Sequence, residues 1–130
     1  YMIAEVIERE NVVQIMNERY NERKLKNKIE EELKKLEYNF SYKGTVYLVD
    51  AIYVLYNLKK SGEYNLGEDV YPILAEHYNT GANNIKCNIT NSTDKKFYDS
   101  EEKVLRAYLK EFTFTKPGPK KIMEAVIKRL

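Results

Sequence analysis

The 130-residue sequence contains no tryptophan, a single cysteine and a single histidine, and only three prolines and five glycines. One cysteine, Cys87, excludes an internal disulfide framework and fits a reducing compartment, so we expect a cytoplasmic location. One histidine, His77, with no second histidine or cysteine at ligand spacing, argues against a metal site, and we expect no cofactor. No apolar run approaches the ~20 residues of a membrane span, so we expect no membrane partner.

The sequence also lacks the marks of a catalytic site. It has no glycine-rich phosphate loop, no catalytic triad and no paired carboxylates that suggest a cleft. We therefore expect a binding or regulatory protein and not an enzyme. The chain opens on Tyr1 instead of methionine, which favours a fragment of a longer protein.

Charge is unevenly distributed, although the net charge is only +2. Residues 1–40 carry eight basic and nine acidic side chains, and residues 41–80 carry three and five. Residues 81–115 carry six basic and five acidic side chains, and residues 116–130 carry five basic side chains and one acidic side chain. A local basic patch matters more for binding a polyanion than the total charge does, so the C-terminal half is the better place for such a site.

Apolar residues recur at helical spacing through most of the chain, and no two segments pair convincingly as strands. The segment 44–60 has the widest apolar face, in which we include Val46, and we expect it at the centre of the core. The alternating stretch FTFTKPGP, residues 112–119, has no partner strand and is predicted to be a linker. The expected helices span residues 2–20, 22–37, 44–60, 68–78, 82–97, 100–110 and 119–130.

The stretch NTGANNIKCNITNSTDKK, residues 79–96, is almost entirely polar, yet Ile85 and Ile89 lie four residues apart, as on one face of a helix. A short turn containing Gly81 joins it to the helix predicted over 68–78. Such a pair is typical of a helix-turn-helix motif, whose second helix lies in the major groove of DNA. There, asparagine can bind adenine and lysine can bind guanine or phosphate. The alternative is a solvated helix on the surface of a small bundle.

Three motifs in order resemble the C-terminal effector domain of the sporulation response regulator, the stage-zero sporulation protein A family. The stretch YKGTVYLVDAI carries Lys43, Gly44, Tyr47, Leu48, Ala51 and Ile52 in register with that family. The stretch VYPILAEHYNT matches it through Tyr71, Pro72, Ala75, Tyr78, Asn79 and Thr80. The closing KPGPKKIMEAVIKRL is similar through Lys116 and Pro117, and upstream Ile29, Leu33 and Leu36 occupy the hydrophobic positions of the family's first helix.

The resemblance implies an all-α, six-helix bundle containing a helix-turn-helix, which binds double-stranded DNA in the major groove and regulates transcription. We place this domain at residues 25–130, preceded by an extra N-terminal helix within residues 1–24. The family's regulator carries a receiver upstream, so an upstream receiver or sensor domain is an expected partner. The competing hypothesis is a protein–protein interaction or dimerisation module that kept the fold and lost specific DNA binding.

The resemblance also points to the DNA-binding residues. The family's recognition helix carries three arginines, and all three are replaced here, so either the target is richer in A·T pairs or binding is weak. From the second helix of the motif the predicted DNA-binding residues are Asn83, Asn84, Lys86, Cys87, Asn88, Thr90 and Asn91. Lys95, Lys96, Lys116 and Lys120 are predicted to contact phosphates.

Residues 1–24 lie outside the resemblance. Met2, Val6, Val13, Met16 and Tyr20 approximate the 4-3 spacing of a coiled coil, which Arg9 interrupts. One interpretation is a helix that forms a homodimer or transmits a signal from an upstream domain, with the apolar residues buried against a second chain. The other is a helix that packs only on its own domain.

Overall fold

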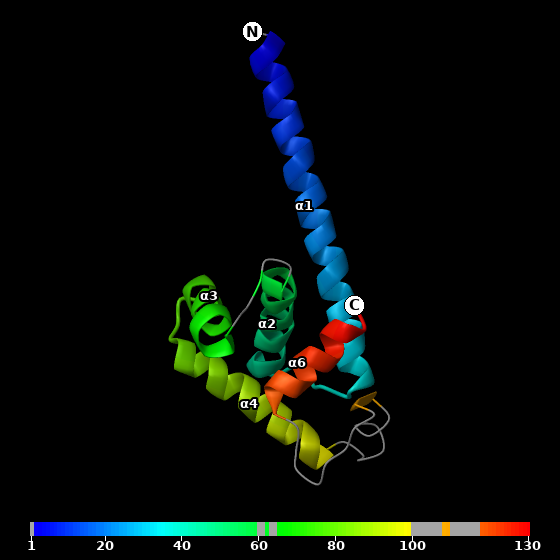
Figure 1. The fold of residues 1–130 in the computed structure, drawn as a ribbon, viewed down its shortest axis with the longest axis vertical. Helices are drawn as coiled ribbons and strands as arrows, with labels where there is room; N and C mark the ends of the chain where they lie inside the picture. The colour runs from blue at the N-terminus through cyan, green and yellow to red at the C-terminus, as the bar shows by residue number, and fades with distance from the viewer. Residues whose placement is uncertain (1, 60–61, 63–64, 100–107, 110–117) are drawn as a thin grey trace.

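The computed structural model describes residues 2–59, 62, 65–99, 108–109 and 118–130, of which 2–15, 17 and 95–99 are described by their backbone alone. Within these residues every regular element is a helix and no strand occurs, which confirms the predicted all-α class. Of the predicted helix over 100–110, only Tyr108 and Leu109 are described, and both are helical; most of the predicted linker lies outside the described residues. The elements are α1 (Met2–Lys35), α2 (Lys43–Lys59), the short π-helical turn η1 (Leu66–Val70), α3 (Tyr71–His77), α4 (Ala82–Asp99) and α6 (Pro119–Lys128) (Figure 1).

The predicted helices 2–20 and 22–37 form one continuous helix, α1, so the expected extra N-terminal helix is an extension of the first helix of the bundle. No glycine or proline lies between Met2 and Lys35, and therefore nothing interrupts the backbone hydrogen bonds of these 34 residues. At about 1.5 Å per residue the helix is roughly 50 Å long. Its first part projects well beyond the other helices (Figure 1).

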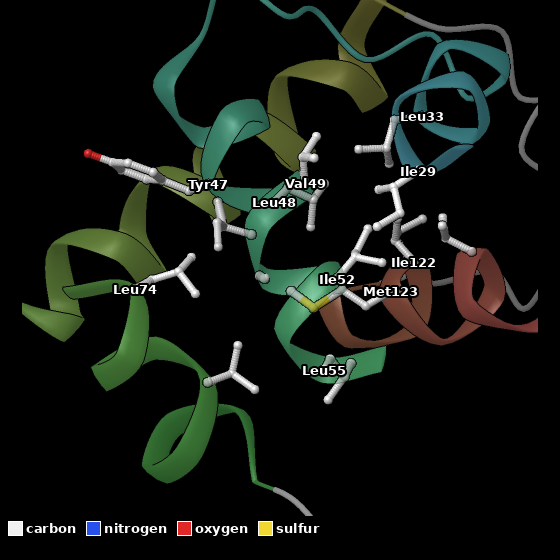
Figure 2. Packing of buried hydrophobic residues seen from close by; sticks show 14 of the residues in the cluster. Ile29, Leu33, Tyr47, Leu48, Val49, Ile52, Leu55, Leu74, Ile122 and Met123 are labelled. Atoms are coloured by element: carbon white, nitrogen blue, oxygen red, sulfur yellow. The ribbon is translucent and has the colours of Figure 1, made fainter. Parts of the chain in front are cut away.

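α2 is the central helix, as predicted, because it contacts α1, η1, α3, α4 and α6. Leu48, Ile52 and Leu55 line one side of it and are fully buried. Figure 2 shows the residues packed around that side, which are Ile29 and Leu33 of α1, Leu74 of α3, and Ile122 and Met123 of α6. The prediction that Val46 shares the buried face is wrong: its side chain is 44% exposed, because at about 100° per residue it lies on the side of α2 opposite Leu48.

Two helices end on a residue with a left-handed backbone. α1 is followed by Glu37 at φ 65°, and α3 is followed by Asn79 at φ 52°. In each case the next backbone N–H donates to a carbonyl five residues earlier, at 3.1 Å for Tyr38 and 2.9 Å for Thr80. This is the Schellman ending, which satisfies the last carbonyls of a helix. Asparagine tolerates the left-handed region, whereas glutamate is strained there.

A polar cluster ties the end of the chain to α1. The Tyr108 hydroxyl donates to Glu32 Oε2 at 2.8 Å, and Lys35 Nζ lies 2.8 Å from Glu32 Oε1. The Arg129 guanidinium lies 3.7 Å from the centre of the Tyr108 ring and donates to the Tyr108 carbonyl. Burial opposes the charge of Glu32, but the hydrogen bonds from Lys35 and Tyr108 outweigh it, so the pKa of Glu32 is lowered. The segment after α6 is therefore held by charge as well as by packing.

Candidate nucleic-acid interface

The turn between α3 and α4 gives the pair its helix-turn-helix form. α3 ends at His77, α4 begins at Ala82, and the two helices pack against each other. The sequence suggests Gly81 as the turn residue, but the left-handed residue is Asn79. A β-carbon at Gly81 would meet no atom within 4 Å, and the φ of Gly81 is not in the left-handed region. The path of the chain into α4 therefore depends on the Schellman ending at Asn79.

α4 is anchored on the core by the two isoleucines predicted for this role. Ile85 and Ile89 are both fully buried. One further turn along the helix, Ser92 and Thr93 are also buried, and their hydroxyls are satisfied by side chains from outside α4. Ser92 Oγ lies 2.5 Å from the Thr45 hydroxyl oxygen of α2, and Thr93 lies at 3.0 Å from the hydroxyl of Tyr38. The inner face of α4 is thus apolar in its first half and hydrogen-bonded in its second half.

The outer face of α4 is polar and open. Asn83, Cys87 and Asn91 recur every four residues on the side opposite Ile85, and all three are exposed. Asn84 and Lys86 are exposed on the two flanks of this stripe. The remaining predicted readers on α4, Asn88 and Thr90, are half-buried.

Asn88 is committed to hydrogen bonds within its own helix. Its side-chain amide donates to the Asn84 backbone carbonyl at 2.8 Å and to Asn84 Oδ1 at 3.0 Å. Asn84 in turn donates from Nδ2 to the Thr80 hydroxyl at 2.9 Å. These hydrogen bonds from Asn88 and to Thr80 hold the Asn84 side chain in one rotamer on the flank of the outer face. Asn88 is therefore better suited to orient Asn84 than to contact a base itself.

Two exposed lysines belong to helices that pack against α4. Lys120, a predicted phosphate contact, is exposed in the first turn of α6, which packs against α4. Lys95 and Lys96 lie on the C-terminal half of α4, where only the backbone is described, and Lys116 lies outside the described residues. Lys43, which the predicted set omits, is exposed at the start of α2 and borders a hollow of 410 Å³.

The hollow beside Lys43 adjoins the outer face of α4. Asn88, Asn91 and Asp94 of α4 form one wall of it, and Ser41 to Gly44 form the other. In the sequence, the only sign that Lys43 lies near this hollow was its place in the family motif beside Gly44. Lys43 precedes α4 by about 40 residues in the chain, so the sequence could not show that the two lie close together. Asp94 is the one exposed acidic group of this wall and lies toward the C-terminal half of α4.

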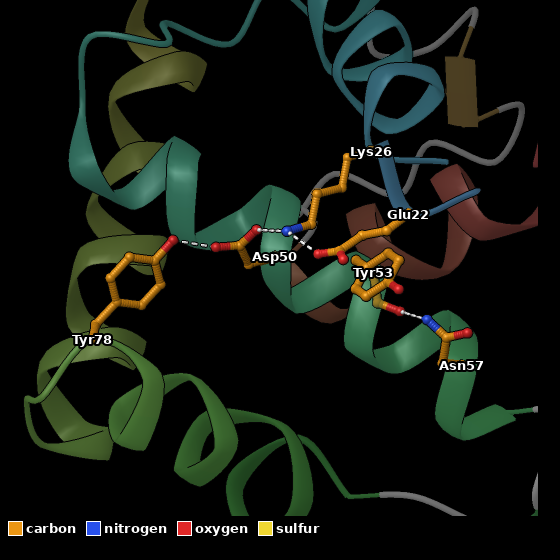
Figure 3. Close-up of polar contacts among 6 residues, drawn as sticks. All are labelled: Glu22, Lys26, Asp50, Tyr53, Asn57 and Tyr78. Carbon is orange, nitrogen blue, oxygen red and sulfur yellow. Dashed lines mark hydrogen bonds and ion pairs between the residues drawn. The ribbon is translucent and has the colours of Figure 1, made fainter. Parts of the chain in front are cut away.

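A second polar cluster links the helix-turn-helix to α1 (Figure 3). The hydroxyl of Tyr78, at the end of α3, donates to Asp50 Oδ2 of α2. Lys26 Nζ of α1 lies 3.2 Å from Asp50 Oδ1 and 3.0 Å from Glu22 Oε1. Burial lowers the pKa of Lys26, but Glu22 and Asp50 outweigh burial and raise it; burial and then the Asp50 carboxylate raise the pKa of Tyr78. Asp50 thus connects α1, through Lys26, with the turn that positions α4, through Tyr78.

Other kinds of site are not supported by the described part of the chain. Among those residues there is no group of three or more His, Cys, Asp or Glu side chains that could hold a metal ion. None of the helices described is long and apolar enough to cross a membrane.

A helix packed on a core through Ile85 and Ile89, presenting a polar outer face after a four-residue turn, defines a helix-turn-helix domain. More particularly, the chain belongs to the family described as the C-terminal domain of the sporulation initiation factor Spo0A, whose family model matches residues 29–130. The resemblance seen in the three motifs is therefore confirmed, and the family is one of DNA-binding transcription regulators. No curated protein matches the chain.

Proposed function

We propose that the domain binds duplex DNA sequence-specifically, with residues 82–91 of α4 in the major groove. The observation that carries this proposal is the division of α4 into two faces. Ile85 and Ile89 are fully buried, while Asn83, Cys87 and Asn91 are exposed on the opposite side. A recognition helix needs both properties, because its anchor must be rigid and its outer face must meet polar base edges.

The proposed target is richer in A·T pairs than a target read by arginines. α4 contains no arginine, and arginine is the commonest bidentate reader of guanine. Asparagine offers one donor and one acceptor, the pattern that adenine matches in the major groove. Asn84 is held by Thr80 and Asn88 and is therefore preorganised, and Asn91 is exposed one turn beyond Asn88. Lys86 is the single described cation on the outer part of α4.

Phosphate contacts would position the helix without reading sequence. Lys43 borders the hollow beside α4, and Lys120 lies in the first turn of α6, which packs against α4. Both are exposed, so they are the described cations proposed for this role. Lys95, Lys96 and Lys116 remain proposed contacts on the basis of the family resemblance. A domain of this kind acts on chromosomal DNA in the cytoplasm, and an upstream receiver or sensor domain would supply its signal.

Selection of bound fragments from a random duplex pool tests the proposal. The intact chain should enrich one motif with adenine contacts at two or more positions, and Asn91→Ala should lose preference at one of them. Lys128→Ala, which changes an exposed lysine at the far end of α6, serves as the matched control and should enrich the same motif. If no motif is enriched and all duplexes bind weakly and equally, the outer face of α4 serves the alternative role of a protein-interaction surface.

A further inference from the structure

The projecting part of α1, residues 2–24, has apolar side chains that are exposed wherever they are described. The two apolar side chains described within it, Met16 and Tyr20, are 64% and 66% exposed. They lie four residues apart and so share one face of the helix. Most helices in proteins are stabilised by packing one apolar face, and the first part of this segment projects beyond the other helices of the described chain (Figure 1). A partner for this face is therefore expected.

The charges of α1 are separated along its length. Residues 2–10 contain three glutamates and one arginine, and residues 11–17 contain no charged side chain at all. Residues 18–28 contain five basic and two acidic side chains. The helix is thus acidic toward its N-terminus, apolar and neutral around Gln14, and basic where it joins the bundle. A copy of the same helix is complementary to it only when the two run in opposite directions, because a parallel copy would align like charges.

An open groove lies where α1 leaves the bundle. Its volume is 680 Å³. One wall comes from α1 and the other from α2, and the lining residues are Glu18, Arg19, Asn21, Glu22, Leu25, Tyr53, Tyr56 and Asn57. In an antiparallel pair centred on Gln14, residues 2–7 of one chain reach residues 21–26 of the other, which is the position of this groove. The sequence of residues 2–7 is MIAEVI, an apolar segment that suits the tyrosine and leucine side chains of the groove.

We propose that residues 2–24 of α1 pair antiparallel with the same residues of a second copy of this chain. The acidic residues 2–10 of each copy lie along the basic residues 18–28 of the other, and residues 2–7 enter the groove of the partner. The contact spans about three heptads, but Arg9 interrupts the apolar spacing, so the complementary charges must contribute to the pairing. The matched family region begins at Ile29, so the pairing helix lies outside it, while the α2 wall of the groove lies inside it. The proposal does not rest on DNA binding. The two DNA-binding units then lie at opposite ends of the paired helices.

Disulfide cross-linking tests the orientation. Cys87 is the only native cysteine, so Cys87→Ser gives a cysteine-free background. In that background, Val6→Cys mixed with Arg23→Cys should form a mixed disulfide on mild oxidation, whereas Val6→Cys alone should not. Abundant self-linking of Val6→Cys would show a parallel pair and overturn the proposal. The absence of any cross-link in the mixture, at concentrations where the chain is dimeric, would also overturn it.

Sedimentation equilibrium tests the pairing itself. The full chain should be a dimer at tens of micromolar and should dissociate as salt rises, because opposite charges contribute to the pairing. Met16→Lys combined with Tyr20→Lys should weaken association by about tenfold or more, since two charges enter the apolar stripe. Val46→Lys, which changes an exposed apolar side chain on α2, is the matched control and should leave association unchanged. A full chain that stays monomeric at high micromolar concentration would show the proposal to be wrong.

Discussion

Gly44 of α2 lies against the backbone of Asn88 in α4, so closely that a β-carbon at Gly44 would stand 1.9 Å from the Asn88 carbonyl oxygen. The same β-carbon would stand 2.7 Å from Ser92 Cβ. Real β-carbons do not approach other atoms so closely, so α2 and α4 can cross at this depth only because position 44 has no side chain. The buried hydroxyl pair of Thr45 and Ser92, at 2.5 Å, lies beside this crossing. The position of the proposed recognition helix is therefore set partly by a glycine outside the helix-turn-helix.

Gly44→Ala should lower the free energy of unfolding and weaken DNA binding. The new methyl group meets backbone and not a flexible side chain, so α4 must shift, at a cost of about 1–3 kcal/mol or more. Gly81→Ala is the matched control, because a β-carbon there meets no atom within 4 Å. Urea denaturation followed by circular dichroism measures both variants. Equal midpoints for Gly44→Ala and the parent protein would contradict the close crossing.

Ile89→Ala should destabilise the domain by about 2–5 kcal/mol, because it removes a fully buried side chain from the anchor of α4. Ile73→Ala in α3 removes the same atoms from a side chain that is 47% exposed, and it should cost much less. Chemical denaturation of both variants gives the difference. If the two substitutions cost the same, Ile89 does not anchor α4 as the structure shows.

Glu37→Gly should stabilise the protein by up to about 1 kcal/mol. An L-residue in the left-handed region costs roughly 1–2 kcal/mol, and the greater freedom of glycine in the unfolded chain offsets part of that gain. Glu37→Ala keeps the backbone strain while removing the charge at the end of α1, so it separates the two effects. The midpoint of thermal unfolding should rise by a few degrees for the glycine variant only. An equal rise for the alanine variant would assign the effect to charge.

Tyr78→Phe should reduce the loss of stability at alkaline pH. Burial and the Asp50 carboxylate raise the pKa of Tyr78 in the folded protein above its ordinary value of 10.0. The unfolded chain therefore loses this proton first, and stability that is complete below pH 10.0 falls as the pH rises further. Lys26, whose pKa is also raised, adds to the same loss.

Urea midpoints between about pH 8 and pH 11 measure this dependence. At neutral pH Tyr78→Phe should cost about 1.5–3 kcal/mol, because it removes a hydrogen bond to a charged group. Above about pH 10 it should lose less stability than the parent does. Tyr20→Phe, at a position exposed in the single chain, is the control, and at protein concentrations too low for pairing it should follow the parent at every pH. Parallel curves for Tyr78→Phe and the parent would exclude a role for the Tyr78 proton.

The sequence was sufficient for the parts of the fold that periodicity determines. The spacing of Ile85 and Ile89 identified the buried side of α4, and the continuous apolar face of residues 44–60 identified the central helix. Periodicity could not separate Asn79 from Gly81 as the left-handed residue, because either type is suited to a turn. It also could not show that the Asn88 side chain donates a hydrogen bond to the Asn84 carbonyl of its own helix, since this depends on the rotamer of Asn88. The approach of Lys43 to α4 depends on tertiary packing alone.

The described residues around α4 should divide into two groups when DNA binding is measured. Asn91→Ala and Lys86→Ala remove side chains from the outer part of α4, so each should weaken the selected site by about 1–3 kcal/mol and relax preference at one base pair. Lys43→Ala and Lys120→Ala should weaken all duplexes about equally and reduce the salt slope by about one unit, since each removes one phosphate contact.

Asn88→Ala provides the sharpest test within this set, because it removes the amide that holds Asn84 but leaves Asn84 in place. We expect it to weaken the selected site by less than Asn84→Ala does, and combining the two should cost little more than Asn84→Ala alone. Gel-shift titrations of the single and double variants across salt concentrations measure this coupling. Additive losses would mean that Asn88 contacts a base directly, and no loss from either variant would mean that this flank of α4 does not face DNA.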